Sequence, residues 1–370
     1  MEPLSRRNFG RIAAVLSAGA ALPFYDEQAL AQLSMVKNMP ADAVKINANE
    51  NPMGPCAEAI EAITKLTRQG GRYRFEETTA LTEALATGEG LKENELQLFA
   101  GSSAPLHQAV LAFCSKERAF IKADPGYEAG ERAAQFIGAR LVNVPLRKGT
   151  WDHDVRAMIS AAPDAGLFYI CNPNNPTGTL TSHAEIEYLV AHKPAGSIVM
   201  VDEAYIHFSP KAQTTTDLVK AGKDVVVLRT FSKLYGMAGL RAGAAFARPD
   251  LLEKLSGFSG GPLPMTAMAG ARASLAVKDL VPERRRVLAG IRNDTFDWLR
   301  ARGAEFIPSE SNCFMLNTKR PGREFFRAMA AHNVYVGRVW PVWPQWVRVT
   351  VGSGDDMAKF KAALASVWSA

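Results

Sequence analysis

The sequence predicts an α/β protein: a large domain in which helices sandwich a mostly parallel sheet, followed by a smaller α+β domain. Three observations support this. The chain has 370 residues, enough for one large domain with a satellite. From Leu98 onward, short apolar strands without a polar face alternate with amphipathic helices, as in parallel sheets covered on both sides. After the Gly- and Pro-rich stretch 257–264, a different pattern begins.

The elements follow in order along the chain. Apolar runs predict strands at Ala119–Lys122, Arg140–Val144, Leu167–Cys171, Ile198–Asp202, Val225–Arg229 and Gly243–Ala247. Helical spacing of apolar residues predicts helices between them, at Ala104–Cys114, Tyr127–Ile137, His183–Ala191 and Leu251–Leu255. In the second domain we expect one long helix over 265–302, strands near 314–316, 334–336 and 346–351, and helices near 322–332 and from Asp355 onward.

The composition is that of a globular protein. Hydrophobic residues make up 47% and charged residues 22%, which excludes a disordered or simple coiled-coil chain. The net charge of +6 is modest, and the one dense basic run, Arg284–Arg286, suits a solvated helix face, so we predict no nucleic-acid binding. The four cysteines lack C-x-x-C spacing and the histidines lack ligand spacing, so we expect buried free thiols and no metal site.

The N-terminus has the features of an export signal. Ser5–Gly10 contains a paired arginine before Phe9, an apolar run spans 12–24, and Ala29–Ala31 forms a small-x-small cleavage site. This pattern predicts a twin-arginine-type signal peptide over residues 1–31 and a periplasmic or exported protein. The alternative is an ordinary amphipathic helix on a cytoplasmic protein. The apolar run is shorter than the about 20 residues of a membrane span, so none is predicted.

Four polar segments carry the chemistry. Asn172–Gly178 follows one predicted strand, while Val201–Tyr205 and Arg229–Lys233 each end another, and Ala238–Arg241 comes shortly after. Because ligands of open α/β sheets bind at the carboxyl ends of strands, these segments are expected to converge. A lysine there suits a Schiff-base nucleophile beside an anion site. An aspartate that ends a buried strand needs a cationic partner, for which a protonated pyridine nitrogen is suitable.

These segments together resemble the fold-type I pyridoxal-phosphate aminotransferases of class I/II, and most closely the histidinol-phosphate aminotransferase branch. The resemblance runs from about residue 44 to the end. It implies an aspartate-aminotransferase-like fold with pyridoxal 5'-phosphate as cofactor. The matching motifs occur in the family's order at Asn47–Pro55, Asn174–Gly178, Asp202–Tyr205, Ser232–Lys233, Ala238–Arg241 and Val347–Gly352.

The resemblance implies a role for each matching residue. Lys233, Asp202 and Tyr205 would form the catalytic set: Lys233 bonds to the cofactor and moves protons, and Asp202 pairs with the ring nitrogen. Asn175 would share the ring's 3' oxygen with Tyr205. The other implied cofactor residues hold the phosphate or stack on the ring, and are Ser102, Ser103, Ser232, Arg241 and Tyr127. Tyr73 would reach the phosphate bound by the other subunit, which implies a homodimer with shared active sites.

On the substrate side, the resemblance implies Arg348, Arg338 and Asn49 as ligands, with both arginines gripping anionic groups. Trp340, Trp343 and Trp346 are interpreted either as an apolar substrate pocket or as domain-core packing. The branch's N-terminal Pro-Tyr segment, associated with the substrate phosphate, has no counterpart, since no tyrosine occurs between Gln32 and Ile46. The physiological donor therefore stays open.

The expected reaction moves an amino group from an amino acid or an amino-alcohol phosphate to a 2-oxo acid, by a ping-pong mechanism. The alternatives are another pyridoxal-phosphate chemistry on this fold (a decarboxylase, lyase or racemase) or a non-catalytic ligand sensor. The expected division of the chain is a signal peptide, an N-terminal arm, a large cofactor-binding domain and a small C-terminal domain, at 1–31, 32–55, 56–257 and 258–370.

Overall fold

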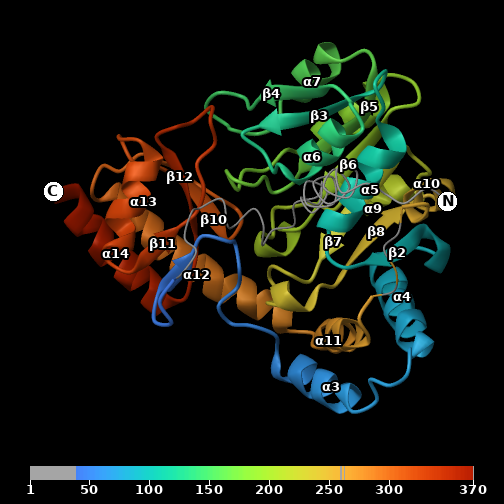
Figure 1. Ribbon diagram of the computed structural model, residues 1–370, viewed down its shortest axis with the longest axis horizontal. Coiled ribbons are helices and arrows are strands. Elements are labelled where there is room, and N and C mark those ends of the chain that lie inside the picture. The colour runs from blue at the N-terminus through green and yellow to red at the C-terminus, as the bar shows by residue number, and fades with distance from the viewer. Residues whose placement is uncertain (1–38, 259–260, 262, 370) are drawn as a thin grey trace, which may run out of the picture.

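The computed structural model describes residues 39–258, 261 and 263–369. The signal peptide predicted over residues 1–31 and the first part of the predicted arm lie outside these residues. The described chain forms two parts side by side, a larger one around a seven-stranded sheet and a smaller one that contains the C-terminus (Figure 1).

The larger part is built on a sheet of β2 (Leu96–Phe99), β3 (Ala119–Asp124), β4 (Leu141–Pro145), β5 (Ala165–Cys171), β6 (Ile198–Asp202), β7 (Val225–Thr230) and β8 (Gly243–Ala247). Their order across the sheet is β2-β8-β7-β6-β5-β3-β4. Only β8 runs antiparallel, both to β2 and to β7. The predicted mostly parallel sheet is therefore confirmed. β5, β6 and β7 are buried along their whole length, which is why their sequences carry no polar face.

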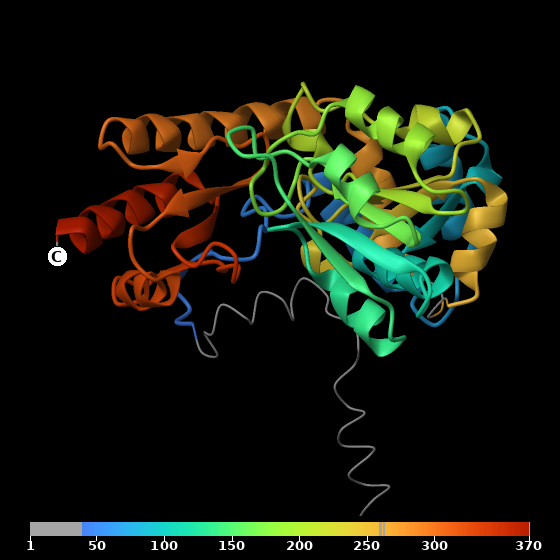
Figure 2. The same ribbon diagram turned by 90° about the horizontal axis from the view of Figure 1, so that it is seen from above.

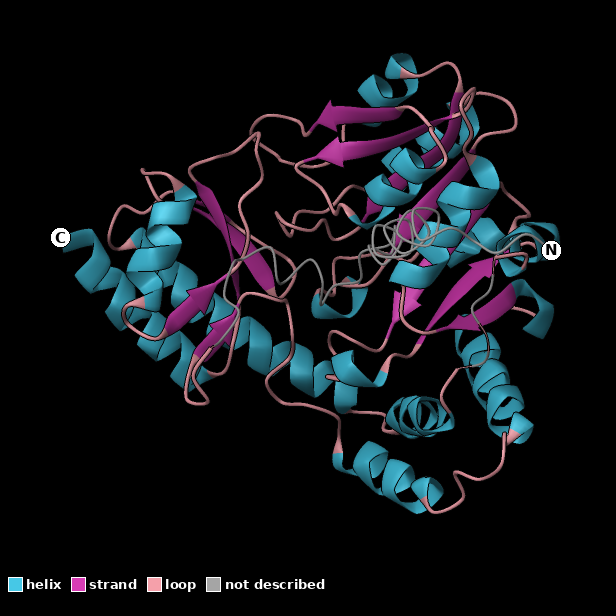
Figure 3. Cartoon of the chain, in the orientation of Figure 1, coloured by secondary structure: helices cyan, strands magenta, loops and turns pink. Residues whose placement is uncertain are grey.

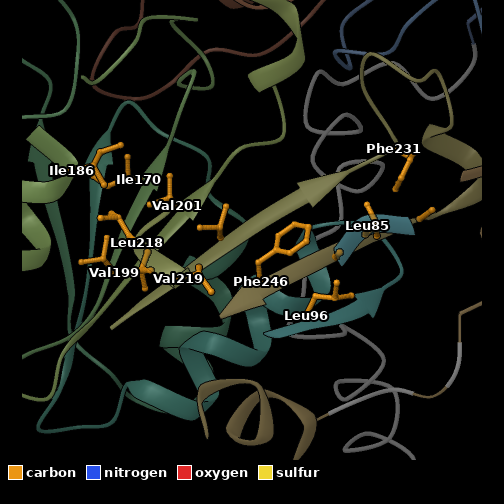
Figure 4. Close-up of a cluster of buried hydrophobic side chains, with 14 of the residues drawn as sticks. Leu85, Leu96, Ile170, Ile186, Val199, Val201, Leu218, Val219, Phe231 and Phe246 are labelled. Carbon is orange, nitrogen blue, oxygen red and sulfur yellow. The ribbon is translucent and has the colours of Figure 1, made fainter. Parts of the chain in front are cut away.

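Helices cover both faces of this sheet. On one face lie α3 (Ala57–Thr67), α4 (Phe75–Glu89), α7 (Val155–Ala161), α8 (His183–His192), α9 (Thr216–Lys220) and α11 (Met265–Ala276). On the other lie α5 (Ser103–Phe113), α6 (Ala129–Phe136) and α10 (Pro249–Ser256). Alternate strand residues enter opposite cores, so Val199 and Val201 pack in the first and Met200 in the second. Figure 4 shows Val199 and Val201 near Ile186 and Leu218 of the covering helices.

The smaller part combines two short sheets with three helices. Its strands are β1 (Val44–Ile46), β9 (Phe306–Ile307), β10 (Cys313–Asn317), β11 (Val334–Val336) and β12 (Trp346–Thr350). β12, β10 and β9 form an antiparallel sheet, and β1 pairs with β11 in parallel. The helices are α12 (Leu280–Arg300), α13 (Gly322–Ala330) and α14 (Gly354–Ser369), which lie around these strands (Figure 3). Side chains of these helices and strands form a separate hydrophobic core. The described residues also form the 3-10 helices η1 (Glu93–Glu95), η2 (Ile206–Phe208) and η3 (Ala238–Leu240).

The single helix predicted over 265–302 is wrong, because the structure has two helices there, α11 and α12, separated by residues 277–279. Pro282 lies in the first turn of α12, where its missing N–H costs nothing, and it would disrupt a continuous helix. α11 packs against α3 and α4 in the core of the larger part. α12 then extends from the larger part to the smaller one (Figure 2).

A buried ion-pair network fixes the end of β6. Glu203 is 1% exposed and accepts a hydrogen bond from Arg229 Nε at 2.7 Å. Its other oxygen accepts from the backbone N–H of Thr215 at 2.7 Å, and Arg229 also pairs with Glu89 at 2.8 Å. Because Glu203 directly follows Asp202, this network holds the carboxyl end of the strand in place.

Two further features concern the chain as a whole. All four cysteines are buried and free. Across residues 39–258, 261 and 263–369, no helix has both the length and the apolar character that crossing a bilayer requires.

Candidate active site

The predicted functional segments meet at one edge of the large sheet. β5 leads into loop 172–178, β6 ends at Asp202, and β7 is followed within three residues by Lys233. β5, β6 and β7 are neighbouring parallel strands, so their carboxyl ends lie together. The predicted convergence of these segments is therefore found in the structure, on the side of the sheet that faces the smaller part (Figure 1).

Asp202 is a buried carboxylate held in a fixed orientation. Its side chain accepts a hydrogen bond from the Tyr169 hydroxyl at 2.9 Å and another from the backbone N–H of Ala204 at 3.1 Å. Burial raises the pKa of Asp202 from 3.8 to about 6, although these hydrogen bonds and the positive charge of Lys233 oppose the shift. A buried acid with such a raised pKa would be stabilised by a cationic ring nitrogen placed beside it.

Lys233 lies beside Tyr205 at the centre of this edge. Its side chain is 6% exposed, and Nζ lies 5.6 Å from the centre of the Tyr205 ring. The Tyr205 hydroxyl accepts a hydrogen bond from Asn49 Nδ2 at 3.0 Å. Asn49 is itself fully buried and held by Thr350, whose hydroxyl donates to Asn49 Oδ1 at 3.0 Å. The N-terminal arm, which carries Asn49, and β12, which carries Thr350, thus hold the Asn49 side chain against the strand ends of the larger part.

An anion cradle lies next to the lysine. Arg241 Nη1 donates to Ser232 Oγ at 3.1 Å, and Nη2 donates to the Ala100 carbonyl at 2.9 Å. Gly101 has a φ of +84°, and a Cβ on it would lie 2.3 Å from Arg241 Nη2, so only glycine lets the arginine approach. α5 begins at Ser103, which places its free backbone N–H groups at the same point. Ser102 precedes it and does not cap the helix with its side chain.

Tyr127 borders the cradle. It is 6% exposed, and its hydroxyl lies 3.1 Å from Ser103 Oγ, within hydrogen-bond distance. The preceding residue, Gly126, is fixed by a hydrogen bond from Trp340 Nε1 to its carbonyl oxygen at 2.9 Å. The aromatic ring predicted to stack on a cofactor is therefore anchored from two sides.

The two late arginines come from neighbouring backbone segments of the smaller part. Arg348 is fully buried, and its guanidinium donates to Asn175 Oδ1 at 2.9 Å and to the Asn47 carbonyl at 2.7 Å. Arg338 is 3% exposed and pairs with Glu128 at 2.5 Å. Both guanidinium groups lie near one indole ring, that of Trp340, at 4.7 Å for Arg338 and 5.9 Å for Arg348.

The three tryptophans belong to one hydrophobic cluster but differ in burial. Trp340 is buried, lies against the two arginines and donates to Gly126. Trp343 and Trp346 are partly buried and pack against this cluster together with Trp151, with Trp343 5.1 Å from Trp151 and 5.7 Å from Trp346.

Within the protomer, Tyr73 does not join the site formed by Lys233, Asp202 and the anion cradle. It lies between α3 and α4, is 80% exposed and stacks on Phe75 at 6.0 Å. Its predicted contact with the phosphate of a second subunit stays a prediction.

The structure also shows residues that the sequence reasoning missed. Tyr169 binds Asp202, Thr350 binds Asn49, and Glu128 binds Arg338. Tyr169 has a recognisable signal, because it is the one hydroxyl-bearing side chain in the apolar strand β5, two residues before its end. Thr350 lies in the recognised motif Val347–Gly352, but the sequence gives no signal for its pairing with Asn49 or for that of Glu128 with Arg338, because these partners are remote in sequence.

Comparison with known proteins identifies the family. The model of the family "Aminotransferase class I and II" matches residues 41–367. The chain belongs to this family. It is 34% identical to a histidinol-phosphate aminotransferase of Nitrosococcus oceani, over 88% of this chain and 89% of that protein. It is 33% identical to an aromatic amino acid aminotransferase of Rhodococcus jostii, over 88% and 90% respectively.

A solved structure supports the same fold. The histidinol-phosphate aminotransferase of Sinorhizobium meliloti, determined in complex with pyridoxal 5'-phosphate, superposes with a TM-score of 0.82. The match covers 94% of this chain and 95% of that one, at 24% identity. The aminotransferase is thus a pyridoxal-phosphate-dependent transaminase, similar to the histidinol-phosphate aminotransferases, with the aspartate-aminotransferase-like fold.

The residues present fit this cofactor. The Arg241 guanidinium, which lies against Gly101, and the backbone N–H groups at the start of α5 form a cradle for a phosphate dianion. The buried acid Asp202 suits a protonated ring nitrogen, and the buried amine Lys233 suits an aldehyde carbon. These three chemical requirements of the aminotransferase are met at the same edge of the sheet.

Proposed function

We propose that this aminotransferase transfers an amino group from an amino donor to a 2-oxo acid, with Lys233 as its catalytic base and acid. When bound, the cofactor supplies an aldehyde that captures the amine and a ring that withdraws electrons. Lys233 holds and moves the proton, since its amine is the basic group buried beside Tyr205 at the strand ends. The observation that carries this proposal is the meeting of Lys233, Asp202 and the Arg241 cradle at one edge.

Other residues orient the cofactor. Asp202 keeps the ring nitrogen protonated, because an ion pair with that nitrogen relieves the cost of burying its carboxylate. Arg348 orients the Asn175 amide by donating to the amide oxygen. The NH2 group of Asn175 is then left to donate to the ring's 3' oxygen, as does the Tyr205 hydroxyl. Tyr127 stacks on the ring, and the phosphate is held by Ser102, Ser103, Ser232 and Arg241.

On the substrate side, Arg348 binds the carboxylate. Its planar guanidinium suits a bidentate contact with a carboxylate, and its contact with Asn175 places it next to the cofactor site. A group that holds the carboxylate favours amino transfer over decarboxylation. Asn49, which donates to the Tyr205 hydroxyl, borders the site on the same side as Arg348.

The test is a visible absorbance spectrum of the purified protein, before and after adding a panel of amino acids. The wild type and Lys148→Ala, which changes an exposed lysine, are expected to show a cofactor band that particular amino acids bleach. Lys233→Ala is expected to lose the bleaching. A wild-type protein without such a band in added cofactor would overturn the proposal. Release of CO2 or ammonia from the donor would instead favour a decarboxylase or lyase.

We also propose a homodimer in which Tyr73 reaches the partner's site. This is supported by the exposed aromatic pair Tyr73 and Phe75, 80% and 72% exposed, in a segment remote from the protomer's own cluster. Tyr73→Phe should weaken cofactor affinity, measured by titration, without changing the mass measured by sedimentation. A monomer in sedimentation at micromolar concentration would contradict this arrangement.

For location, we propose export through the twin-arginine-type signal in residues 1–31. The support is the sequence alone: paired arginines, the apolar run and the Ala29–Ala31 site. Cell fractionation tests it, because replacing Arg6 and Arg7 with lysine should retain the protein in the cytoplasm. A wild-type protein found in the cytoplasm would contradict the proposal.

A further inference from the structure

Two arginines of the smaller part share one aromatic ring beside the site but differ in their contacts. Arg348 and Arg338 are joined by a backbone hydrogen bond from Arg348 N to Arg338 O at 3.0 Å. Both are buried, and both lie against Trp340. Arg348 donates to the neutral oxygens of Asn175 and Asn47. Arg338 instead forms an ion pair with a carboxylate, that of Glu128.

Glu128 lies next to residues that we expect to contact the cofactor and the donor. It directly follows Tyr127, the residue expected to stack on the cofactor, and immediately precedes α6. Its carboxylate lies 2.5 Å from Arg338 Nη2 and is 22% exposed, whereas the arginine is 3% exposed. The pair joins the loop after β3 to the segment after β11, across 210 residues of sequence.

We infer that Glu128 neutralises Arg338 and thereby makes the site selective for amino donors whose side chain is uncharged. This rests on the proposed function, because it concerns the donor of that reaction. Arg338 thus acts as a paired structural cation, unlike the second anion ligand predicted from the sequence. A phosphate or second carboxylate on the donor that approached Arg338 would meet the carboxylate of Glu128 at the same guanidinium.

The effect of Glu128 on an anionic donor follows from Coulomb's law. Two unit negative charges about 5 Å apart, at an effective dielectric constant of about 20, repel by an amount that corresponds to a factor on the order of 100 in affinity. This repulsion offsets most of the attraction that an unpaired Arg338 would exert on the same anionic group. The alternative, separating Glu128 from Arg338 on binding, leaves a buried charge without its partner and is also unfavourable. In either case donors such as glutamate or histidinol phosphate are disfavoured relative to phenylalanine or leucine.

The chain offers a matched control on the same helix. Glu131 lies in the first turn of α6 and pairs with Lys122, 2.9 Å away. It is 25% exposed, close to the value for Glu128, but its partner is Lys122 and not Arg338. Glu131→Gln removes the same charge and leaves the Glu128–Arg338 ion pair in place. Because the charge of Glu131 raises the pKa of Glu128, its removal favours the ionised form of Glu128 that this pair requires.

The experiment measures kcat/KM of the amino-donor half-reaction in the cofactor-loaded enzyme. Wild type should prefer phenylalanine or leucine over glutamate and histidinol phosphate, because a neutralised Arg338 leaves the cost of burying a second anion uncompensated. Glu128→Gln should reduce that preference at least tenfold, mainly through KM, while Glu131→Gln should retain it. Glu128→Met serves as a second variant if the glutamine variant fails to fold, as judged by circular dichroism.

Binding gives a second readout that needs no turnover. Calorimetry should show that wild type binds 3-phenylpropionate more tightly than glutarate and that Glu128→Gln narrows this difference. A wild type that prefers glutamate or histidinol phosphate, or a preference unchanged in Glu128→Gln, would overturn the inference. An enzyme that no amino acid converts would refute the proposed function, and the calorimetry would still decide the role of Glu128.

Discussion

Replacing Asp202 with asparagine is expected to stabilise the cofactor-free protein. Burial raises the pKa of this carboxyl from 3.8 to about 6. An acid with a higher pKa in the folded state binds its proton more tightly there, so ionising it opposes folding. That cost is small below about pH 4, grows between the two pKa values and is complete above about pH 6. A shift of about two pKa units corresponds to about 3 kcal/mol.

Asparagine retains the local hydrogen bonds while removing the charge. Its carbonyl oxygen can accept from the Ala204 N–H, and its NH2 group can donate to the Tyr169 hydroxyl oxygen. The gain in unfolding free energy of Asp202→Asn over wild type should therefore be about 3 kcal/mol at pH 8 and about 1 kcal/mol at pH 4.5. With cofactor bound, the sign should reverse, since the ring nitrogen loses its anionic partner.

Urea denaturation of the two cofactor-free proteins at both pH values measures this difference. Asp224→Asn is the opposite-sign control. Burial alone would raise the pKa of Asp224, but hydrogen bonds from Lys193 and Arg248 hold it below its usual value. Its replacement should therefore destabilise the protein near neutral pH and matter less as the pH falls. A stability gain in Asp202→Asn that does not grow with pH would refute the reasoning.

Two further substitutions test the surroundings of the site. Gly101→Ala should weaken cofactor affinity at least tenfold in a spectroscopic titration, because its methyl group would displace Arg241 from the cradle; an unchanged affinity would argue against a phosphate there. Glu203→Gln should lower the unfolding free energy by about 3 kcal/mol in urea denaturation, because it leaves the buried Arg229 with an incomplete ion-pair network. A loss under about 1 kcal/mol would show that Glu89 alone satisfies the arginine.

The sequence predicted those features whose signals are local. Asp202 and Lys233 could be assigned to strand ends because each follows a short apolar run, and a parallel sheet collects such ends at one edge. An anion site was predicted beside Lys233 because Ser232 precedes it and Arg241 follows it closely, and the resemblance to the family added Ser102 and Ser103. The break between α11 and α12 was missed, although Pro282 carries a start signal, because the apolar spacing continues across residues 277–279.

Contacts between remote segments could not be predicted in this way. Glu128 gave no indication of its pairing, since its partner Arg338 is 210 residues away and an acid after a tyrosine is unremarkable by itself. Likewise, Asn49 belongs to a recognisable motif, but its bonds to Tyr205 and Thr350 depend on how the smaller part docks. Both depend on packing between the two parts, which has no periodic signature in the sequence.

The position of Asn49 has a consequence for the order in which the protein can assemble during synthesis. The arm leaves the ribosome among the first described residues, yet β1 pairs with β11, and Asn49 binds Thr350 at the end of β12. The seven strands of the large sheet can therefore form before β11 and β12, the partners of β1 and of the Asn49 backbone, have been made. The site gains its N-terminal wall only when nearly the whole chain has been made, so a chain truncated before β12 would carry Lys233 and Asp202 in an open, incomplete site.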